Sequence, residues 1–432
     1  MRYEEAMRYI TEVGNFGSNY GLERTYKLLE YLRNPEKGLK LIHIAGTNGK
    51  GSTTSMITEI LMGSGYKVGM YTSPFIEEFE ERIQINRNNI PKEILASLMD
   101  EVKEAVDKVI EDGYNHPTEF EIITVLMLLY FKREEINFGV IEVGLGGKLD
   151  STNVISPILQ VITSISFDHT NLLGNTLEEI AGEKAGIIKN NIPTVIYPQE
   201  EEALKVIKNK CVDMKSELYI ANKNNMEFVK VVNDDKPYQL LKYKEEFDIL
   251  LPLLGEHQIL NLSVAMKAIE VLNNRKIINI TYESMIKSIK NVIWKGRLEV
   301  LSNNPYVVID GAHNIQGIKA LSENIRKYFK YENLYLILGI LADKDVDEMI
   351  KSITPMAKKV YAVTPNSIRA ELAEDLKNEI IKYNDNCQAY NDYKEAYLTA
   401  LHDAGESDLI LASGSLYMIG DMRKIINKTV IE

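Results

Sequence analysis

A glycine-rich segment from Gly46 to Ser52 has the residue types of a phosphate-binding loop. It follows residues 39–45, an apolar run that predicts a strand, and it opens residues 51–62, which predict a helix. In that context glycines let backbone N–H groups turn towards phosphate oxygens, and the helix N-terminus adds a partial positive charge. Lys50 could contact the β- and γ-phosphates of a nucleotide, and the Ser52 hydroxyl could ligate Mg²⁺.

The loop departs from the common G-x-x-x-x-G-K-[ST] pattern, because Gly51 separates Lys50 from Ser52. A turn that only packs a helix onto a sheet is therefore the alternative. The lysine, the serine and the order of strand, loop and helix favour nucleotide binding.

Acidic and imidazole side chains follow two other predicted strands. Glu142 lies near the end of residues 138–143, and His169 comes soon after residues 158–165. A buried carboxylate is costly unless it meets a cation. Beside a phosphate loop that cation is expected to be Mg²⁺, although an ion pair with a buried lysine or arginine is the alternative for Glu142. A structural hydrogen bond is the alternative for His169.

The elements around these residues indicate two α/β domains. The chain has 432 residues, too many for one ordinary core. Short β-branched runs alternate with helices up to about residue 200, which predicts a mostly parallel sheet in an N-terminal P-loop ATPase-like domain. Residues 228–251 predict a small antiparallel hairpin. A second βα alternation begins after Trp294 and predicts a smaller, C-terminal, Rossmann-like doubly wound domain, so we expect domains at 1–295 and 296–432.

Composition limits the classes of partner. The net charge is −12, which argues against nucleic-acid binding. The longest apolar run, residues 122–131, is about half the length of a membrane span, so no membrane association is expected. The two cysteines are far apart, and the N-terminus lacks the apolar stretch of a signal peptide. We therefore expect a cytoplasmic protein, and a monomer.

The residues from His43 to Ser52 resemble the loop of folylpolyglutamate synthases and dihydrofolate synthases, which belong to the Mur-ligase superfamily. Similar motifs continue in the same order along almost the whole chain, beginning with Gly21 to Arg24. The resemblance implies an ATP-dependent carbon–nitrogen ligase that adds L-glutamate to a folate-type carboxylate through an acyl phosphate. The acceptor would be a folate such as tetrahydrofolate, dihydropteroate, or both. This chemistry needs no protein nucleophile, and the sequence has no Ser-His-Asp or Cys-His signature.

The resemblance also implies roles for individual residues. ATP contacts are expected from Thr47, Asn48, Gly49, Lys50, Gly51, Ser52, Asn261, Arg297, Asp310 and His313. Two Mg²⁺ sites are expected to use Ser52, Ser73, Glu142, His169 and Lys184, the last as a carbamate derived from CO₂. Catalytic roles are expected for Lys50, Lys184, His169 and Arg297. Substrate contacts are expected from Tyr20, Gly21, Thr118, Phe120, Leu149, Asp150, Ser151 and Ser413, with glutamate in the second domain.

Several of these roles have alternatives. Lys184 could instead be a protonated amine that binds phosphate or Glu142, and Asp310 could be a helix N-cap. Thr118 could simply start a helix, and residues 149–151 could be a loop. Another Mur-superfamily amino-acid ligase is less favoured, because its additional N-terminal domain does not fit before Gly46. A non-catalytic nucleotide-binding regulator would not need the motifs of the second domain.

Overall fold

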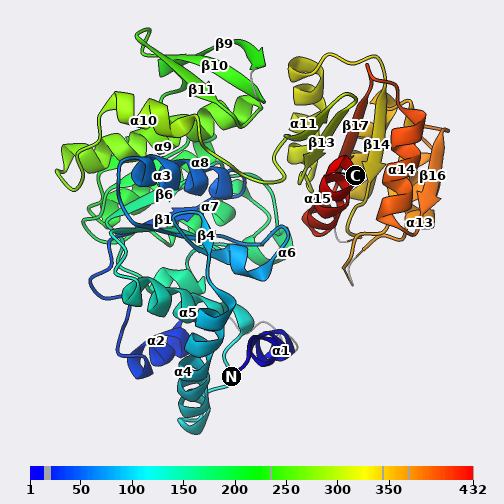
Figure 1. Ribbon diagram of the computed structural model, residues 1–432. Helices are drawn as coiled ribbons and strands as arrows, with labels where there is room; N and C mark the ends of the chain where they lie inside the picture. The colour runs from blue at the N-terminus through cyan, green and yellow to red at the C-terminus, as the bar shows by residue number, and fades with distance from the viewer. Residues whose placement is uncertain (14–20, 234–235, 343–344, 368–369, 432) are drawn as a thin grey trace. The chain divides into compact units, whose positions relative to one another are not determined.

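The structure is a computed structural model that describes residues 1–13, 21–233, 236–342, 345–367 and 370–431. The chain divides into two compact units. The first unit comprises residues 1–75, 79–226 and 260–291, and the second comprises residues 76–78, 227–259 and 292–432. Each unit is built on its own large sheet (Figure 1).

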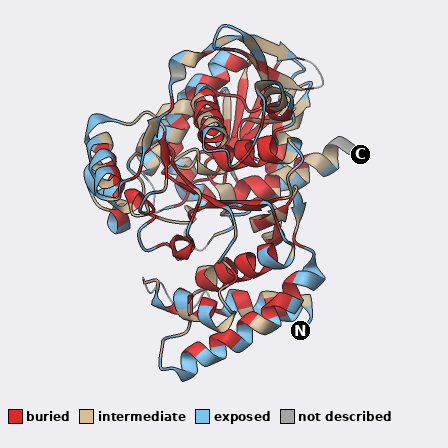
Figure 2. Ribbon diagram, turned by 90° about the vertical axis from the view of Figure 1, so that its left-hand side faces the viewer, coloured by how far each residue is buried: buried red, intermediate tan, exposed pale blue. Residues whose placement is uncertain are grey.

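The first unit contains an eight-stranded sheet in the order β4-β3-β2-β5-β1-β6-β7-β8. Its strands are β1 Leu41–Ala45, β2 Val68–Tyr71, β3 Ile83–Ile85, β4 Asn88–Asn89, β5 Phe138–Glu142, β6 Leu159–Ile162, β7 Thr194–Ile196 and β8 Leu218–Ile220. All neighbours are parallel except β2–β3 and β3–β4. The central strands β1, β2, β5 and β6 are buried throughout (Figure 2), as expected for apolar strands covered on both faces.

Helices cover this sheet. They are α1 Tyr3–Val13, α2 Glu23–Tyr31, α3 Lys50–Gly63, α4 Lys92–Glu111, α5 Glu119–Arg133, α6 Thr170–Leu173, α7 Leu177–Ala185, α8 Glu201–Asp213, α9 Glu256–Asn274 and α10 Tyr282–Ile289, with short 3₁₀ turns at Phe79–Arg82, Ser151–Val154 and Lys223–Asn225. Helices α1, α2, α4 and α5 share one core with Leu41, Tyr71 and Ile141 of the sheet. Helix α3 packs against β1, β2, β5 and α10, so the helix that follows the glycine-rich loop lies on the sheet's centre.

The second unit contains a six-stranded sheet in the order β12-β13-β17-β14-β15-β16. Its strands are β12 Glu299–Asn303, β13 Tyr306–Asp310, β14 Leu334–Leu338, β15 Lys359–Val363, β16 Cys387–Tyr390 and β17 Leu409–Ser413. Its helices are α11 Ile315–Tyr328, α12 Val346–Ile353, α13 Ala373–Ile380, α14 Tyr393–Asp403 and α15 Leu416–Ile431, with a 3₁₀ turn at Thr354–Met356. Successive residues of β13 and β17 join cores on opposite faces, one with α11, α12 and α13 and the other with α14 and α15 (Figure 1). The expected mixed α/β fold with a doubly wound sheet is confirmed.

Residues 227–259, which we expected in the first domain, group with the second unit. They form three antiparallel strands rather than a single hairpin: β9 Met226–Asn233, β10 Pro237–Tyr243 and β11 Phe247–Leu251. The reason is packing, because the Phe228 ring centroid lies 5.8 Å from that of Tyr328 on α11. The Tyr328 hydroxyl also donates a 2.7 Å hydrogen bond to Gln239 Oε1.

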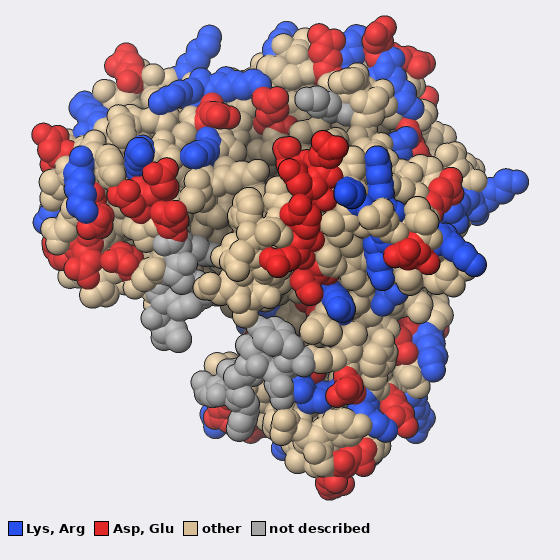
Figure 3. Space-filling view, turned by 180° about the vertical axis from the view of Figure 1, so that it is seen from behind, with Lys and Arg blue, Asp and Glu red and all other residues tan. Residues whose placement is uncertain are grey.

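Acidic side chains gather in a band near the middle of the face in Figure 3, whereas basic and acidic side chains are interspersed elsewhere on that face. The net charge of the chain is −12 over 432 residues. Among the described residues, no helix combines the length and the apolar character needed to cross a membrane.

Candidate functional site

The glycine-rich loop joins β1 to α3 at the centre of the first sheet. Gly46 and Gly49 have φ angles of 148° and 86°, and Gly49 is the N-cap of α3. A Cβ atom on Gly46 would lie 1.8 Å from Thr163 Oγ1, and one on Gly49 would lie 2.4 Å from Asn261 Oδ1. Glycine is therefore required at both positions, and Asn261 lies directly against the loop. The first N–H groups of α3 open onto this loop, a favourable arrangement for an anion.

The chain after β6 fixes the loop's conformation. Thr47 N donates to Ser164 O at 2.8 Å, and Thr47 Oγ1 donates to Ser166 O at 3.1 Å. Asn48 Nδ2 donates to Ser166 Oγ at 3.2 Å. We expected a strand over 158–165, but β6 ends at Ile162 because the following residues turn to bind the loop. Thr47 and Asn48 thus stabilise the loop, whatever contact they make with a nucleotide.

Two lysines converge on one carbonyl of the loop. Lys50 Nζ donates to Gly46 O and to Thr47 O, each at 3.1 Å, and Lys184 Nζ donates to Gly46 O at 2.9 Å. Lys184, on α7, is 3% exposed. Burial lowers its pKa to about 7, and the neighbouring Lys50 adds to the effect. A pair of amines that shares a neutral carbonyl is a site where an anion would be strongly stabilised.

The acidic residue at the sheet edge lies where the sequence predicted it. Glu142 is the last residue of β5 and is buried, and its Oε2 accepts a 3.3 Å hydrogen bond from Ser73 N. Ser73 follows β2, the strand beside β5, and Ser52 is buried in the first turn of α3. Carboxylate and hydroxyl oxygens are the hard donors that Mg²⁺ prefers, and Mg²⁺ commonly takes one or two carboxylates plus phosphate oxygens. These residues therefore fit a magnesium ion that a nucleotide would help to hold.

His169 lies in the segment that follows β6. It is the N-cap of α6, and its side chain is 39% exposed, with Nε2 3.8 Å from Asp168 Oδ2. In the part of the chain that the structure describes, no three His, Cys, Asp or Glu side chains gather as a metal site. The structure therefore places His169 near the end of the loop-binding segment, with Asp168 beside it.

The residues expected to contact the substrate have structural roles of their own. Thr118 caps α5 in a reciprocal pair with Glu121, with Glu121 N donating to Thr118 Oγ1 at 3.3 Å. Asp150 is buried, and its two oxygens accept from Leu145 N at 2.9 Å and Thr152 N at 3.0 Å. Both alternatives from the sequence, a helix start and a loop, therefore describe real functions of these side chains.

The remaining members of that set differ in exposure. Leu149 is 46% exposed, whereas Ser151 is buried. A Cβ atom on Gly144 would lie 2.5 Å from the Phe120 ring, so this ring packs on the loop that follows β5. Gly21 precedes α2, and Tyr20 lies outside the described residues.

A hydrogen-bonded network that includes His43 was missed in the sequence. His43, in the middle of β1, is fully buried and lies 2.9 Å from Thr152 Oγ1, which in turn donates to Asp150 Oδ1. Burial lowers the pKa of His43 to about 3, so this imidazole is neutral. A histidine inside an otherwise apolar strand was the available signal.

In the second unit Asp310 organises the chain around Arg297. Its Oδ2 accepts from Leu298 N and its Oδ1 from Ala312 N, both at 2.8 Å. Burial raises the pKa of Asp310, and the guanidinium of Arg297 opposes that shift. A Cβ atom on Gly311 would lie 2.6 Å from Arg297 Nη1, so the arginine lies against this turn.

Asp310 is not the N-cap of α11. That role belongs to Asn314, whose Oδ1 accepts from Gly317 N at 2.7 Å. His313 turns back, with Nδ1 2.8 Å from Gly311 O. The alternative reading of Asp310 as a cap is therefore wrong.

His257 is a further buried imidazole near Arg297. Burial lowers its pKa to about 4, and the charge of Arg297 contributes to the shift. Its Nδ1 lies 3.5 Å from Asn324 Nδ2. A Gly-x-His pattern was visible in the sequence, but its proximity to Arg297 was not.

Ser413 ends β17 at the same sheet edge as Asp310, its partner in the β13–β17 register. Its side chain is completely buried, and among the described residues its Oγ has no hydrogen-bond partner. The next residue, Gly414, has φ 111°, and a Cβ atom there would lie 2.4 Å from Gly339 O. An unsatisfied hydroxyl at the carboxyl end of parallel strands is placed for a polar ligand.

Comparison with known proteins agrees with this geometry. Residues 44–269 match the Mur ligase middle domain, and residues 296–416 match the Mur ligase glutamate ligase domain. The chain is 37% identical to a dihydrofolate synthase/folylpolyglutamate synthase of Bacillus subtilis, over 98% of each protein. A folylpolyglutamate synthase of Mycobacterium tuberculosis, solved with ADP and AMPPCP, superimposes with a TM-score of 0.87 at 27% identity and covers 98% of this chain and 99% of that one. An FPGS–AMPPCP–folate complex has a TM-score of 0.84 at 31% identity over the full length of both chains. The chain therefore belongs to the Mur ligase family, in the group of folylpolyglutamate and dihydrofolate synthases.

Proposed function

We propose that this chain is an ATP-dependent ligase that joins L-glutamate to a folate-type carboxylate. The position of Lys50 at the opening of α3, where its Nζ donates to Gly46 O and Thr47 O, carries the proposal. Lys50 supplies positive charge that phosphoryl transfer needs, and the family supplies the class of reaction. The relatives' names and the folate-bound neighbour support folate as the acceptor class.

The reaction follows from these parts. Lys50 and Arg297 stabilise negative charge on the γ-phosphate while an oxygen of the folate carboxylate attacks phosphorus and the bond to ADP breaks. The product is an acyl phosphate. The amine of glutamate then attacks the acyl carbon, the bond to phosphate breaks, and the amine loses a proton as the amide forms. The protein positions and desolvates these groups and forms no covalent bond to them.

The finer metal sites are part of the proposal. Ser52, Ser73, Glu142 and His169 would hold two Mg²⁺ ions, with phosphate oxygens as further ligands. Magnesium would neutralise phosphate charge. The burial of Glu142 at the strand end, beside Ser73, supports its part in this set.

Lys184 is proposed to carry a carbamate. Its neutral amine adds to the carbon of CO₂, a C–N bond forms, and one proton leaves, giving a carbamate anion. A pKa of about 7 leaves a large share of the amine neutral, which this addition requires. One N–H remains after the addition, so the bond to Gly46 O can persist.

Chemical rescue separates the carbamate from a protonated lysine. In Lys184→Ala, a short carboxylic acid such as acetate should restore part of the activity, because it replaces the carbamate's oxygens. An alkylamine should not. Rescue by the amine alone would show that Lys184 acts as a cation, and the ligase assignment would survive.

The remaining assignments concern the substrate contacts, the oligomeric state and the cellular location. Gly21, Thr118, Phe120, Leu149, Asp150 and Ser151, together with Tyr20, are proposed to surround the pterin-bearing substrate. Asn261, Asp310 and His313 are proposed ATP contacts, and Ser413 a glutamate contact. A monomer in the cytoplasm, where ATP is available, completes the proposal.

One assay tests the function. Phosphate release from ATP should require both glutamate and a folate-type acceptor, and dihydropteroate and tetrahydrofolate should be compared as acceptors. Turnover with one or with both acceptors defines the reaction as dihydrofolate synthesis, polyglutamylation or the two together. ATP binding without acceptor-dependent phosphate release would instead indicate a regulator, and turnover only with a nucleotide-sugar acceptor would indicate a cell-wall ligase.

A further inference from the structure

Three residues of the N-terminal region, Ile76 to Glu78, group with the second unit although the residues on either side belong to the first. They are held there by α15, the last helix of the chain. A Cβ atom on Gly420 of α15 would lie 1.7 Å from Ile76 O, so only glycine allows this approach. Lys424 Nζ also donates to Glu77 O at 2.8 Å.

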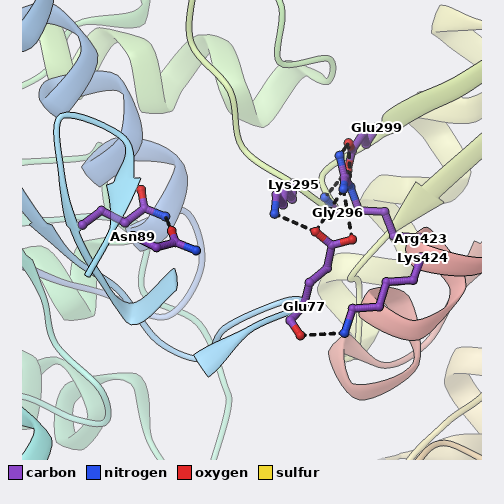
Figure 4. A network of polar contacts seen from close by, with 8 residues as sticks. Glu77, Asn89, Lys295, Gly296, Glu299, Arg423 and Lys424 are labelled. Atoms are coloured by element: carbon purple, nitrogen blue, oxygen red, sulfur yellow. Dashed lines mark hydrogen bonds and ion pairs between the residues drawn. The ribbon is translucent and has the colours of Figure 1, made fainter. Parts of the chain in front are cut away.

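The Glu77 carboxylate is the centre of an ion-pair network (Figure 4). It accepts from Lys295 Nζ at 2.7 Å and from Arg423 Nη1 at 3.1 Å. Arg423 reaches across to Glu299, with Nη2 donating to Oε1 at 2.8 Å. Glu299 Oε2 in turn accepts from Gly296 N at 2.8 Å. We call Glu77, Lys295, Glu299 and Arg423 the Glu77 latch.

The latch is partly buried, unlike an ordinary surface ion pair. The Glu77 side chain is 13% exposed, and those of Arg423 and Glu299 are 19% exposed. Burial would raise the pKa of Glu77, but Lys295 and Arg423 outweigh it, so its pKa lies below the usual range. Removing one member would leave partly desolvated charges without partners, which is costly.

The network surrounds the residue that carries the proposed phosphate contact. Lys295, Gly296 and Glu299 all belong to the short segment that contains Arg297. Lys295 binds Glu77 directly, and Glu299 is connected to Glu77 through Arg423. Gly296 N donates to Glu299.

We propose that Glu77 is a positioning residue: through Arg423 and Lys295 it fixes the Lys295–Glu299 segment and thereby the orientation of Arg297. It does not contact reactants. The role of Arg297 rests on the proposed function, whereas the fixing of the segment does not.

Trp294 allows the structural part to be measured alone. It is the only tryptophan of the chain and directly precedes Lys295. In Glu77→Gln, acrylamide quenching of its fluorescence should increase, because the segment is less restrained. Arg423→Met should give at least as large an increase, since it removes the bond to Glu299 as well. The double variant should show less than the sum of the two single effects, because both substitutions remove the Glu77–Arg423 bond, but more than Arg423→Met alone, because it also loses the Lys295–Glu77 bond.

The catalytic part is measured in the ligase assay. In Glu77→Gln, kcat should fall between about tenfold and a hundredfold, the cost of a misplacement on the order of an ångström. KM for ATP should change less than about threefold, because the nucleotide's other contacts remain. Glu77→Asp, which keeps the charge, should recover part of kcat.

Asp403→Asn is the matched control. Asp403 is a partly buried carboxylate of the same unit that accepts from Lys359 Nζ at 2.8 Å and Tyr361 Oη at 2.7 Å. Its loss should leave Trp294 quenching and kcat unchanged. If Glu77→Gln does not fold, Lys295→Met loosens the latch by one bond and is read in the same way.

The outcomes are distinct. Unchanged quenching and kcat in Glu77→Gln, or equal effects in Asp403→Asn, would overturn the proposal. Increased quenching with unchanged kcat would also reject the positioning role. If Arg297→Ala itself keeps full turnover, the proposed function of Arg297 fails, while the quenching result still decides whether the latch fixes the segment.

Discussion

The two sheet edges use charge in opposite ways. In the first unit, Lys50 and Lys184 donate to the carbonyl of Gly46, which carries no full negative charge. In the second unit, the carboxylate of Asp310 accepts from two backbone N–H groups and holds the turn beside Arg297. Lys50 is thus available to an incoming anion, whereas Asp310 is engaged in the fold.

Charge at the first edge can therefore bind a ligand, whereas charge at the second edge stabilises the fold. Substituting Lys50 at the first edge should affect chemistry far more than stability, because its two bonds reach carbonyls only three and four residues away. Substituting Asp310 should affect stability first, because two buried N–H groups would lose their acceptor. The latch around Arg297 belongs to the second kind, since it holds a segment in place.

The largest effect is expected for Lys50→Ala. Turnover should fall by about 10³-fold or more, because charge that stabilises the transferring phosphate is lost. The thermal midpoint should change by less than about 3 °C, since the hydrogen bonds of the Lys50 side chain to the described residues go to Thr47 O and Gly46 O, three and four residues away. Steady-state kinetics and calorimetry check both statements. A folded variant with near-normal turnover would contradict the assignment.

Asp310→Ala should destabilise the second unit by about 2–4 kcal/mol, since Leu298 N and Ala312 N lose their acceptor. Urea unfolding followed by Trp294 fluorescence reports on this unit. Asp408→Ala is the control, because that buried carboxylate also accepts from two backbone N–H groups but precedes β17, at the amino end of the strand. Both variants should lose similar stability, and only Asp310→Ala should also lose activity below its midpoint.

The sequence predicted the regular elements well because they follow simple patterns. Apolar runs ending in glycine or an acid gave β1 and β5, and the βα alternation gave the second sheet. It failed where polar residues form strands. The edge strand β12, Glu299–Asn303, is only partly buried and has no apolar run. Residues 163–165 were predicted as the end of a strand, but Ser164 O accepts a hydrogen bond from Thr47 N of the phosphate loop.

The candidate site was predicted as a set of residues and not as a set of contacts. Glu142 and Lys184 were identified by type and order, but the target of Lys184, Gly46 O, depends on how α7 packs. The sequence left Asp310 as either a nucleotide contact or a helix N-cap. It did not indicate that this carboxylate binds the backbone N–H groups of Leu298 and Ala312. The pair of Glu77 and Arg423 is separated by 346 residues, so no local pattern indicates it.

A smaller effect is expected from the pH dependence of Lys184. Its pKa is about 7 in the folded protein and near 10.5 when unfolded, so between these values the unfolded chain binds more protons. The unfolding free energy should therefore rise with pH in this window, by up to about 1.4 kcal/mol per pH unit from this group. Lys184→Met should lose that slope in CO₂-free buffer.

Lys132→Met is the control for this slope. Lys132 is exposed and also donates to a backbone carbonyl, that of Lys37, at 2.9 Å. Because its side chain meets water in both states, its removal should leave the slope as in the wild type. An equal slope in Lys184→Met and in the wild type would show that Lys184 is charged in the folded protein.

The smallest effect on stability is expected for Ser413→Ala, and its sign is informative. The buried Oγ of Ser413 has no partner among the described residues, so removing it should leave stability unchanged or raise it by about 1 kcal/mol. Ser322→Ala is the matched control, because Ser322 Oγ lies 2.9 Å from Ile318 O and 3.1 Å from Ser352 O, and its loss should cost about 1 kcal/mol.

If Ser413 binds glutamate, KM for glutamate should rise about tenfold in Ser413→Ala while KM for ATP stays constant, as one lost hydrogen bond predicts. Thermal unfolding and the two KM values separate the possibilities. Destabilisation comparable to that of Ser322→Ala would mean that the hydroxyl is satisfied within the fold, and an unchanged KM for glutamate would remove Ser413 from the glutamate site.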